Sequence, residues 1–175
     1  MLDAITRMSL LPDADDRKRA TRLVARQPPG ENEVMVLRLL RDTRSTAVAD
    51  AMARSLLQSW REAAVPLVLR ALGQDIPAAD AARDHFDATS QVLLESLLDS
   101  ELDGLDVRGE IVSVLLATEQ SHELVGALEA IGWIAPSGGF PATETALAQV
   151  DRLSGHADEL VRGLALKARA ALTAQ

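Results

Sequence analysis

Apolar residues recur along this chain three and four positions apart, which is the spacing of amphipathic helices, and strand-like alternation is absent. Asp13 is placed to cap the start of a helix, a proline-proline-glycine run at 28–30 ends that helix, and Gly73 is expected to cap a later one. The stretch 77–100 is predicted as one long helix or as two joined near Asp87. We therefore expect an all-α fold of about nine to ten helices, forming one domain over residues 1–175. The predicted helices lie near 2–10, 13–27, 31–42, 45–60, 62–73, 77–100, 104–118, 121–134, 142–154 and 157–173.

Three segments repeat one arrangement, in which an apolar helix end is followed, after a short polar gap, by a valine that opens the next helix. In the second and third segments Arg-Gly follows the valine. A helix hairpin cannot bury its apolar stripe alone, so such hairpins are expected to stack around a continuous core. The three pairs are Leu40 and Val48, Leu98 and Val107, and Leu153 and Val161, with gaps of 8, 9 and 8 residues.

At these residues the chain resembles the HEAT-repeat family, whose signature is an apolar helix ending in Leu-Leu, a short Asp-containing turn, and Val-Arg opening a second helix. The resemblance covers about half of the chain. It implies a right-handed stack of antiparallel helix hairpins, that is, a HEAT/armadillo-like α-α superhelix. The valines are 59 and 54 residues apart, longer than the roughly 40–47 residues of such units. Extra helices near 62–73 and 121–134, as degenerate repeats, would account for the difference.

Composition narrows the classes of function. The chain has no cysteine, which excludes disulfides, thiolate nucleophiles and Cys-ligated zinc. The first residues lack the pattern of a signal peptide, and no run of about 18 apolar residues occurs, so we expect a cytoplasmic protein with no membrane span. Aromatic residues make up only 2% of the chain, which predicts a core of Leu, Ala, Val and Ile.

The net charge of −8 is unevenly distributed. Residues 1–70 hold 12 Lys and Arg against 9 Asp and Glu, residues 71–129 hold 2 against 13, and residues 130–175 hold 4 of each. Acids clustered before Val107 have two explanations: they complement the dipole at the start of the following helix, or they form a docking surface for a basic protein. The candidate partner-binding acids are Glu95, Asp99, Glu101, Asp103, Asp106 and Glu110.

Trp133 and Phe140 form a second candidate interface, since two of the four aromatic residues lie within eight positions beside flexible glycines. Aromatic residues are frequent in binding hot spots, and they also seal the open ends of helical stacks. An alternative interpretation is a winged helix, in which residues 110–134 supply two helices and Gly138-Gly139 supplies a wing.

No catalytic, cofactor-binding or metal-binding motif emerges. Glu119 and His122 have the Glu-x-x-His spacing of di-iron bundles, but that chemistry needs a second copy and two further carboxylates. A basic run lies at 17–26, but acids precede it and no aromatic residue interleaves for base stacking, so nucleic-acid binding is not favoured.

The sequence thus predicts a non-enzymatic scaffold or adaptor that binds a protein partner through a helical, partly acidic surface. One alternative is a ligand-binding or lyase-type protein, because short bacterial HEAT-like proteins are often similar to the bilin lyase family. A winged-helix nucleic-acid regulator is the further alternative.

Overall fold

The computed structural model describes residues 2–74, 87–138, 140 and 143–174, and in these ranges the regular structure is helical with no strand. The all-α prediction is therefore confirmed. Of the predicted stretch 77–100, residues 77–86 lie outside the described part, and a helix begins directly after Asp87. The helices are α1 (Leu2–Leu10), α2 (Ala14–Val24), α3 (Glu33–Leu40), α4 (Thr46–Trp60), the 3₁₀ helix η1 (Arg61–Ala64), α5 (Val65–Leu72), α6 (Ala88–Leu102), α7 (Val107–Ala117), α8 (Ser121–Ile134), the 3₁₀ helix η3 (Ala135–Ser137), α9 (Thr143–Leu153) and α10 (Glu159–Thr173).

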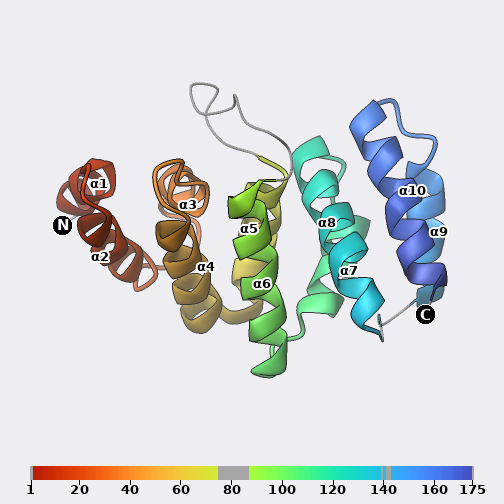
Figure 1. Ribbon diagram of the computed structural model, residues 1–175, viewed down its shortest axis with the longest axis horizontal. Coiled ribbons are helices and arrows are strands. Elements are labelled where there is room, and N and C mark those ends of the chain that lie inside the picture. Colours follow the sequence, from red (N-terminus) through yellow and green to blue (C-terminus); the bar gives the residue numbers. More distant parts are fainter. Residues whose placement is uncertain (1, 75–86, 139, 141–142, 175) are drawn as a thin grey trace.

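The helices stand side by side in a row that runs from the N-terminus at one end to the C-terminus at the other (Figure 1). Consecutive helices pack as pairs in α1 with α2, α3 with α4, α7 with α8, and α9 with α10. Along the row, α2 packs on α4 and α4 on α6, while α3 packs on α5 and α5 on α7. From α1 to α4, each helix thus contacts its partner in a pair and the helix two positions further along the chain.

Aspartates fix where several helices begin. Asp13, Asp87, Asp106 and Asp158 each accept hydrogen bonds from backbone N–H groups in the first turn of the helix that follows. These N–H groups have no partner inside the helix, so the carboxylate satisfies them. The predicted cap at Asp13 is confirmed. The caps at Asp106 and Asp158 explain why α7 and α10 begin three and two residues later than the apolar pattern predicted.

The three repeated valines, Val48, Val107 and Val161, are completely buried at the start of α4, α7 and α10. Two of the three segments are packed pairs, but the middle one joins α6 to α7, and α7 packs more extensively on α8. The sequence pattern therefore marks the burial of each valine correctly and misses that its middle copy links two pairs.

The packing departs from the pattern of α2, α4 and α6 at α8, because α8 packs on α5 rather than mainly on α6. Two glycines allow this contact. A Cβ on Gly126 would lie inside the van der Waals radius of the Leu69 carbonyl oxygen, and one on Gly73 would meet the His122 carbonyl in the same way. Gly73 does end α5 as predicted, but its φ of −76° is open to any residue. Its small size, not its backbone freedom, is what this position requires.

Between α2, α4 and α6 the contact includes buried charges. Arg17 of α2 is 1% exposed, and its Nε donates to Oδ2 of Asp42 at 2.7 Å, while its Nη1 donates to the carbonyls of Leu11 and Pro12. Asp42 in turn accepts the backbone N–H groups of Arg44 and Ser45, which lead into α4. One buried ion pair thereby ties the start of α4 to α2.

A second buried arginine forms a similar ion pair with an aspartate at the start of α6, one step further along the row. Arg41, whose side chain is completely buried, donates to Ser90 Oγ at 2.9 Å and to Asp87 Oδ2 at 2.8 Å at the start of α6. Burial raises the pKa of the Asp87 carboxyl, but the backbone N–H of Ser90, the charge of Arg41 and hydrogen bonds from both side chains outweigh it. The pKa of Asp87 therefore lies below its ordinary value.

Candidate functional site: a mixed-charge groove between α4 and α6

The exposed face of α6 carries an acidic stripe. Glu95, Asp99 and Asp103 follow one another at four-residue intervals, so they lie along one exposed side of α6, and its C-terminal part borders α4. At 1.5 Å per residue the three carboxylates span roughly 12 Å. We call these three residues the α6 stripe.

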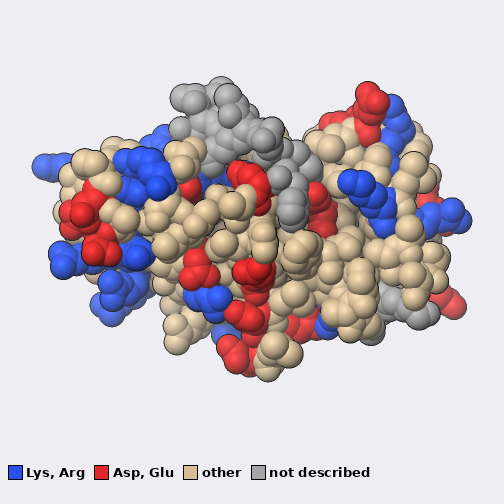
Figure 2. All heavy atoms as spheres, in the orientation of Figure 1, with Lys and Arg blue, Asp and Glu red and all other residues tan. Residues whose placement is uncertain are grey.

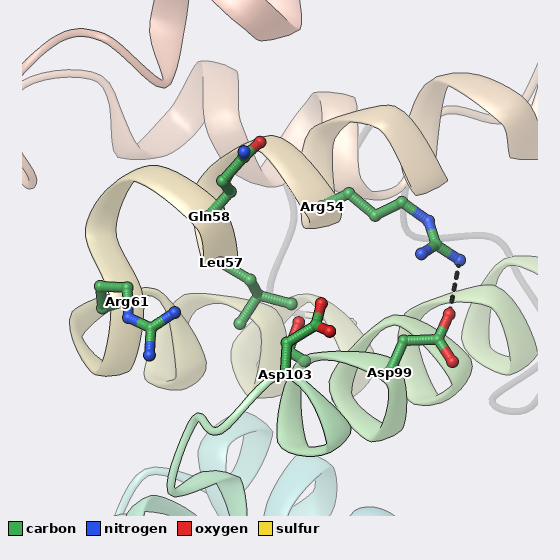
Figure 3. Close-up of a pocket in the computed structure, with 7 residues that line it drawn as sticks. Arg54, Leu57, Gln58, Arg61, Asp99 and Asp103 are labelled. Carbon is green, nitrogen blue, oxygen red and sulfur yellow. Dashed lines mark ion pairs between the residues drawn. The ribbon is translucent and has the colours of Figure 1, made fainter.

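A groove of about 270 Å³ opens where the C-terminal halves of α4 and α6 meet (Figure 3). In the close-up, Arg54 reaches across from α4 to Asp99 on α6, Leu57 and Asp103 lie between the helices, and Arg61 lies near the end of α4. Two cationic and two anionic side chains therefore share one opening. The lining residues are Arg54, Leu57, Gln58, Arg61, Asp99, Ser100 and Asp103.

Arg54 is the electrostatic centre of this groove. Its Nε lies 2.6 Å from Asp50 Oδ1 within α4, and its Nη2 lies 2.9 Å from Asp99 Oδ2 on α6. The hydrogen bonds to Asp50 and Asp99 raise the pKa of the guanidinium further above its ordinary value, so Arg54 keeps its charge. Asp50 also accepts a hydrogen bond from Ser96 Oγ at 3.3 Å, which adds a second polar link between the two helices.

Arg61 has an unusual backbone conformation. Its φ is 55° and its ψ is −134°, at the step from α4 into η1. A residue with a Cβ is strained there, by about 1–3 kcal/mol. The strain coincides with the position from which the Arg61 side chain lines the groove.

Two further acids predicted as partner-binding residues have structural contacts, and a third lies in the first turn of α7. Glu101 is largely buried in an ion pair with Arg108 of α7, and Arg108 also donates to Ser137 Oγ at 3.0 Å. Asp106 caps α7 by accepting the N–H of Gly109, and Glu110 lies in the first turn of that helix. The dipole explanation given for the acidic cluster therefore applies to Asp106 and Glu110.

That explanation is wrong for the other members. Asp99 and Glu101 lie in the last turn of α6 and Asp103 is its C-cap, where the helix dipole is negative. Only a structure could place them there, because the sequence pattern started the next helix near residue 104.

The aromatic pair is divided between surface and interior. Phe140 is 3% exposed and belongs to the core, whereas Trp133 on α8 is 39% exposed. The two residues therefore do not form one exposed aromatic patch. Near them, residues 135–137 form a 3₁₀ turn, and of the proposed Gly138-Gly139 wing only Gly138 is described, outside any strand.

Within the described ranges no group of three or more His, Asp or Glu side chains is arranged to hold a metal ion, and no helix is long and apolar enough to cross a bilayer. Glu119 and His122 are both exposed, at and just after the turn between α7 and α8. No protein-family model, curated protein or solved structure matches the chain.

Two of the groove's charged residues, Arg54 and Arg61, and their neighbour Asp50 were missed by the sequence analysis. The spacing of Asp50 and Arg54, four residues apart in a predicted helix, is a signal for an ion pair that could have drawn attention to α4. Nothing in the sequence indicated that Arg61 would line a groove.

Proposed function

We propose that the protein is a non-enzymatic scaffold, built as a HEAT-like α-α superhelix, that docks a basic protein surface on the α6 stripe. The observation that carries the proposal is the position of carboxylates at the C-terminal end of α6.

The superhelix is supported by the packing described above. Packed helix pairs occur along the row, and α4 contacts both α2 and α6. Repetition of this kind generates an extended surface on each side of the row, which repeat proteins use to bind partners.

Charge at the end of α6 costs stability. Each carboxylate near the negative end of a helix is unfavourable by about 0.3–1 kcal/mol at low ionic strength. Like charges four residues apart add about 0.2–0.5 kcal/mol per pair. The α6 stripe destabilises its helix through both the dipole and the like-charge repulsion. Its presence is therefore not explained by folding, and it supports a role in binding.

The stripe retains negative charge that the described residues do not neutralise. Asp99 is paired with Arg54, but Asp103 has no ion-pair partner among the described residues, and Glu95 accepts only the neutral Gln91 amide at 2.9 Å. In the space-filling view, Asp and Glu side chains gather over the middle of the molecule, including the lower part of α6 (Figure 2). A basic partner would gain charge pairing there without displacing a buried contact.

The test is a pair of measurements on Glu95→Gln/Asp103→Asn. Neutralising these residues should raise the free energy of unfolding by about 0.3–1 kcal/mol, because the dipole and the like-charge repulsion are relieved. The same change should weaken capture of a basic partner about tenfold in low salt and flatten the dependence of binding on salt. Partner capture is measured by pull-down from cell extract, followed by titration of the purified partner.

The matched control is Glu144→Gln/Glu159→Gln, which removes two exposed acids from the first turns of α9 and α10. It changes the net charge equally and should leave partner capture unchanged. A partner that binds both variants as well as the wild-type protein would contradict the proposal.

A further inference from the structure

Two surfaces on this chain are complementary to each other in shape and charge. The first is a shallow apolar dimple of about 310 Å³ lined by residues of α1, of α2 and of the turn after α2, at the N-terminal end of the row. Met8 and Leu23 supply apolar surface, and Arg19, Arg22 and Arg26 stand around it. The three arginines are exposed. Arg19 and Arg22 lie on α2 within four residues of Leu23, and Arg26 lies in the turn that follows the helix.

The second surface is an apolar knob at the C-terminal end of α6. Leu102 is 87% exposed, the highest value among the exposed large apolar side chains of the described residues. Asp103 follows it directly, and Asp99 precedes it by one helical turn. Both acids are exposed. An exposed leucine beside carboxylates is therefore matched by an apolar dimple beside guanidinium groups.

The two surfaces of one chain cannot meet. The dimple is lined by residues of the α1–α2 pair at the N-terminal end of the row, and α4 packs between α2 and α6 (Figure 1). Basic side chains gather at the N-terminal end and acidic ones over the middle (Figure 2). A second copy of the chain supplies each surface with its counterpart.

We propose that the protein self-associates head to side, with Leu102 of one copy seated in the dimple of Met8 and Leu23 of the next, and the α6 carboxylates against Arg19, Arg22 and Arg26. This inference rests on the proposed function, because it names a second copy as a partner of the α6 stripe.

The outer face of α10 is a poorer counterpart for the knob. It has an apolar groove near Leu160 and Leu164, but the charges beside it are of both signs, Glu159 and Lys167. An acidic knob would meet attraction and repulsion together there. All the charged side chains that line the dimple are cationic.

The contact uses two different surfaces, so each copy can insert its knob into one neighbour and accept the knob of another in its dimple. Such heterologous contacts build open chains or rings rather than a closed twofold dimer. A single leucine and a few charge pairs make a small interface, so we expect weak association that grows with protein concentration. Because the charges are exposed, the association is screened by salt, with a Debye length of about 10 Å at 0.1 M.

The experiment is sedimentation velocity on the full chain, as a function of concentration and salt. Wild-type protein should show a mass average that rises with concentration in low salt and falls to the monomer in high salt. Arg22→Glu/Arg26→Glu removes the receiving surface, and Leu102→Ser/Asp103→Asn removes the knob. Each should weaken self-association by about tenfold or more, with the helical circular dichroism of the wild-type protein retained.

Mixing the two variants is the decisive step. The receiving-surface variant keeps its knob and the knob variant keeps its dimple, so together they should form a one-to-one dimer that cannot grow. Arg152→Glu/Lys167→Glu changes the charge by the same amount as the receiving-surface variant, but on α9 and α10, and should associate as the wild-type protein does.

A wild-type chain that stays monomeric in low salt overturns the self-association, and so does a mixture of variants that stays monomeric. If that monomer still captures a basic partner through Glu95 and Asp103, the proposed function stands and only this inference fails. If Arg22→Glu/Arg26→Glu instead abolishes binding of a random-sequence DNA duplex by a monomeric wild-type chain, the basic face serves nucleic acid and this inference is equally overturned.

Discussion

Two junctions in the row are made in opposite ways. Between α2, α4 and α6 the helices are joined by buried arginines, Arg17 on Asp42 and Arg41 on Asp87. Between α5 and α8 they are joined by backbone touching backbone, at Gly73 and Gly126. Directional hydrogen bonds set the register of the first junction, and the absence of side chains sets the distance of the second. The comparison shows that neighbouring helices in the row can be positioned either by buried ion pairs or by close backbone packing at glycines.

The largest expected effect is at the charged junction. Asp42→Ala leaves the guanidinium of Arg17 buried and without its anion, and it removes the acceptor for the N–H groups that lead into α4. Breaking a buried ion pair on one side costs about 3–5 kcal/mol of unfolding free energy. Urea denaturation followed by circular dichroism measures the loss.

Asp42→Asn separates the two roles of this residue. The amide oxygen can still accept the N–H groups of Arg44 and Ser45, while the charge that faces Arg17 is lost. The asparagine variant should be less damaging than the alanine variant. Equal losses would show that the ion pair alone matters and that the turn before α4 needs no acceptor.

A smaller effect is expected at the close junction. Gly126→Ala places a methyl group against the Leu69 carbonyl, where backbone rather than a flexible side chain must move. Overpacking of this kind costs about 1–3 kcal/mol, and the midpoint of thermal unfolding should fall accordingly. The two-junction comparison fails if the variant is as stable as the wild-type protein.

The control lies in the same helix. A Cβ at Gly132 of α8 would meet no atom within 4 Å. Gly132→Ala should therefore stabilise the protein by about 0.5–1 kcal/mol, since alanine favours the helix interior. Opposite signs at positions 126 and 132 would attribute the loss to the junction with α5 rather than to helix propensity.

The smallest effect is a pH dependence at the second charged contact. The pKa of Asp87 is lower in the folded protein than in the unfolded chain, so the folded state favours the ionised carboxylate. Its stabilisation is present above the unfolded pKa of about 3.9 and is lost as the pH falls through the lower folded value. Asp87→Asn should flatten the fall in unfolding free energy below about pH 4, measured by urea denaturation across an acid series. An unchanged pH profile would show that the folded state does not favour the ionised form of Asp87.

The sequence was sufficient for the helical class and for much of the core, because the three-four periodicity and capping residues such as Asp13 are local signals. It was insufficient at the α5–α8 junction. Gly73 reads as a helix end whether or not another helix lies against it, and Gly126 gives no local sign of a neighbour. Close approach depends on residues about fifty positions apart, which no window along the chain contains.

The candidate site was predicted only in part, because its acids lie close together in the sequence whereas its other residues are brought to it by tertiary contacts. A count of charges located the acidic region, and Asp99 and Asp103 do line the groove. The count could not place them at the end of α6 rather than at the start of α7. It also could not distinguish the acids that have structural contacts from those that are exposed without an ion pair to any described residue. The first group is Glu101 and Asp106, and the second is Glu95 and Asp103. The cations of the groove come from α4 and from the first residue of η1, and the packing of α4 on α6 is a tertiary contact.

Arg61 occupies a conformation in which glycine would be the more comfortable residue. Arginine at such a position places a side chain where the backbone conformation disfavours one. A library of substitutions at residue 61 would therefore rank differently in two assays: glycine should lead in abundance, and arginine should lead in whatever activity the groove serves. The residue thus offers a way to recognise the protein's true activity among candidate assays before any partner has been identified.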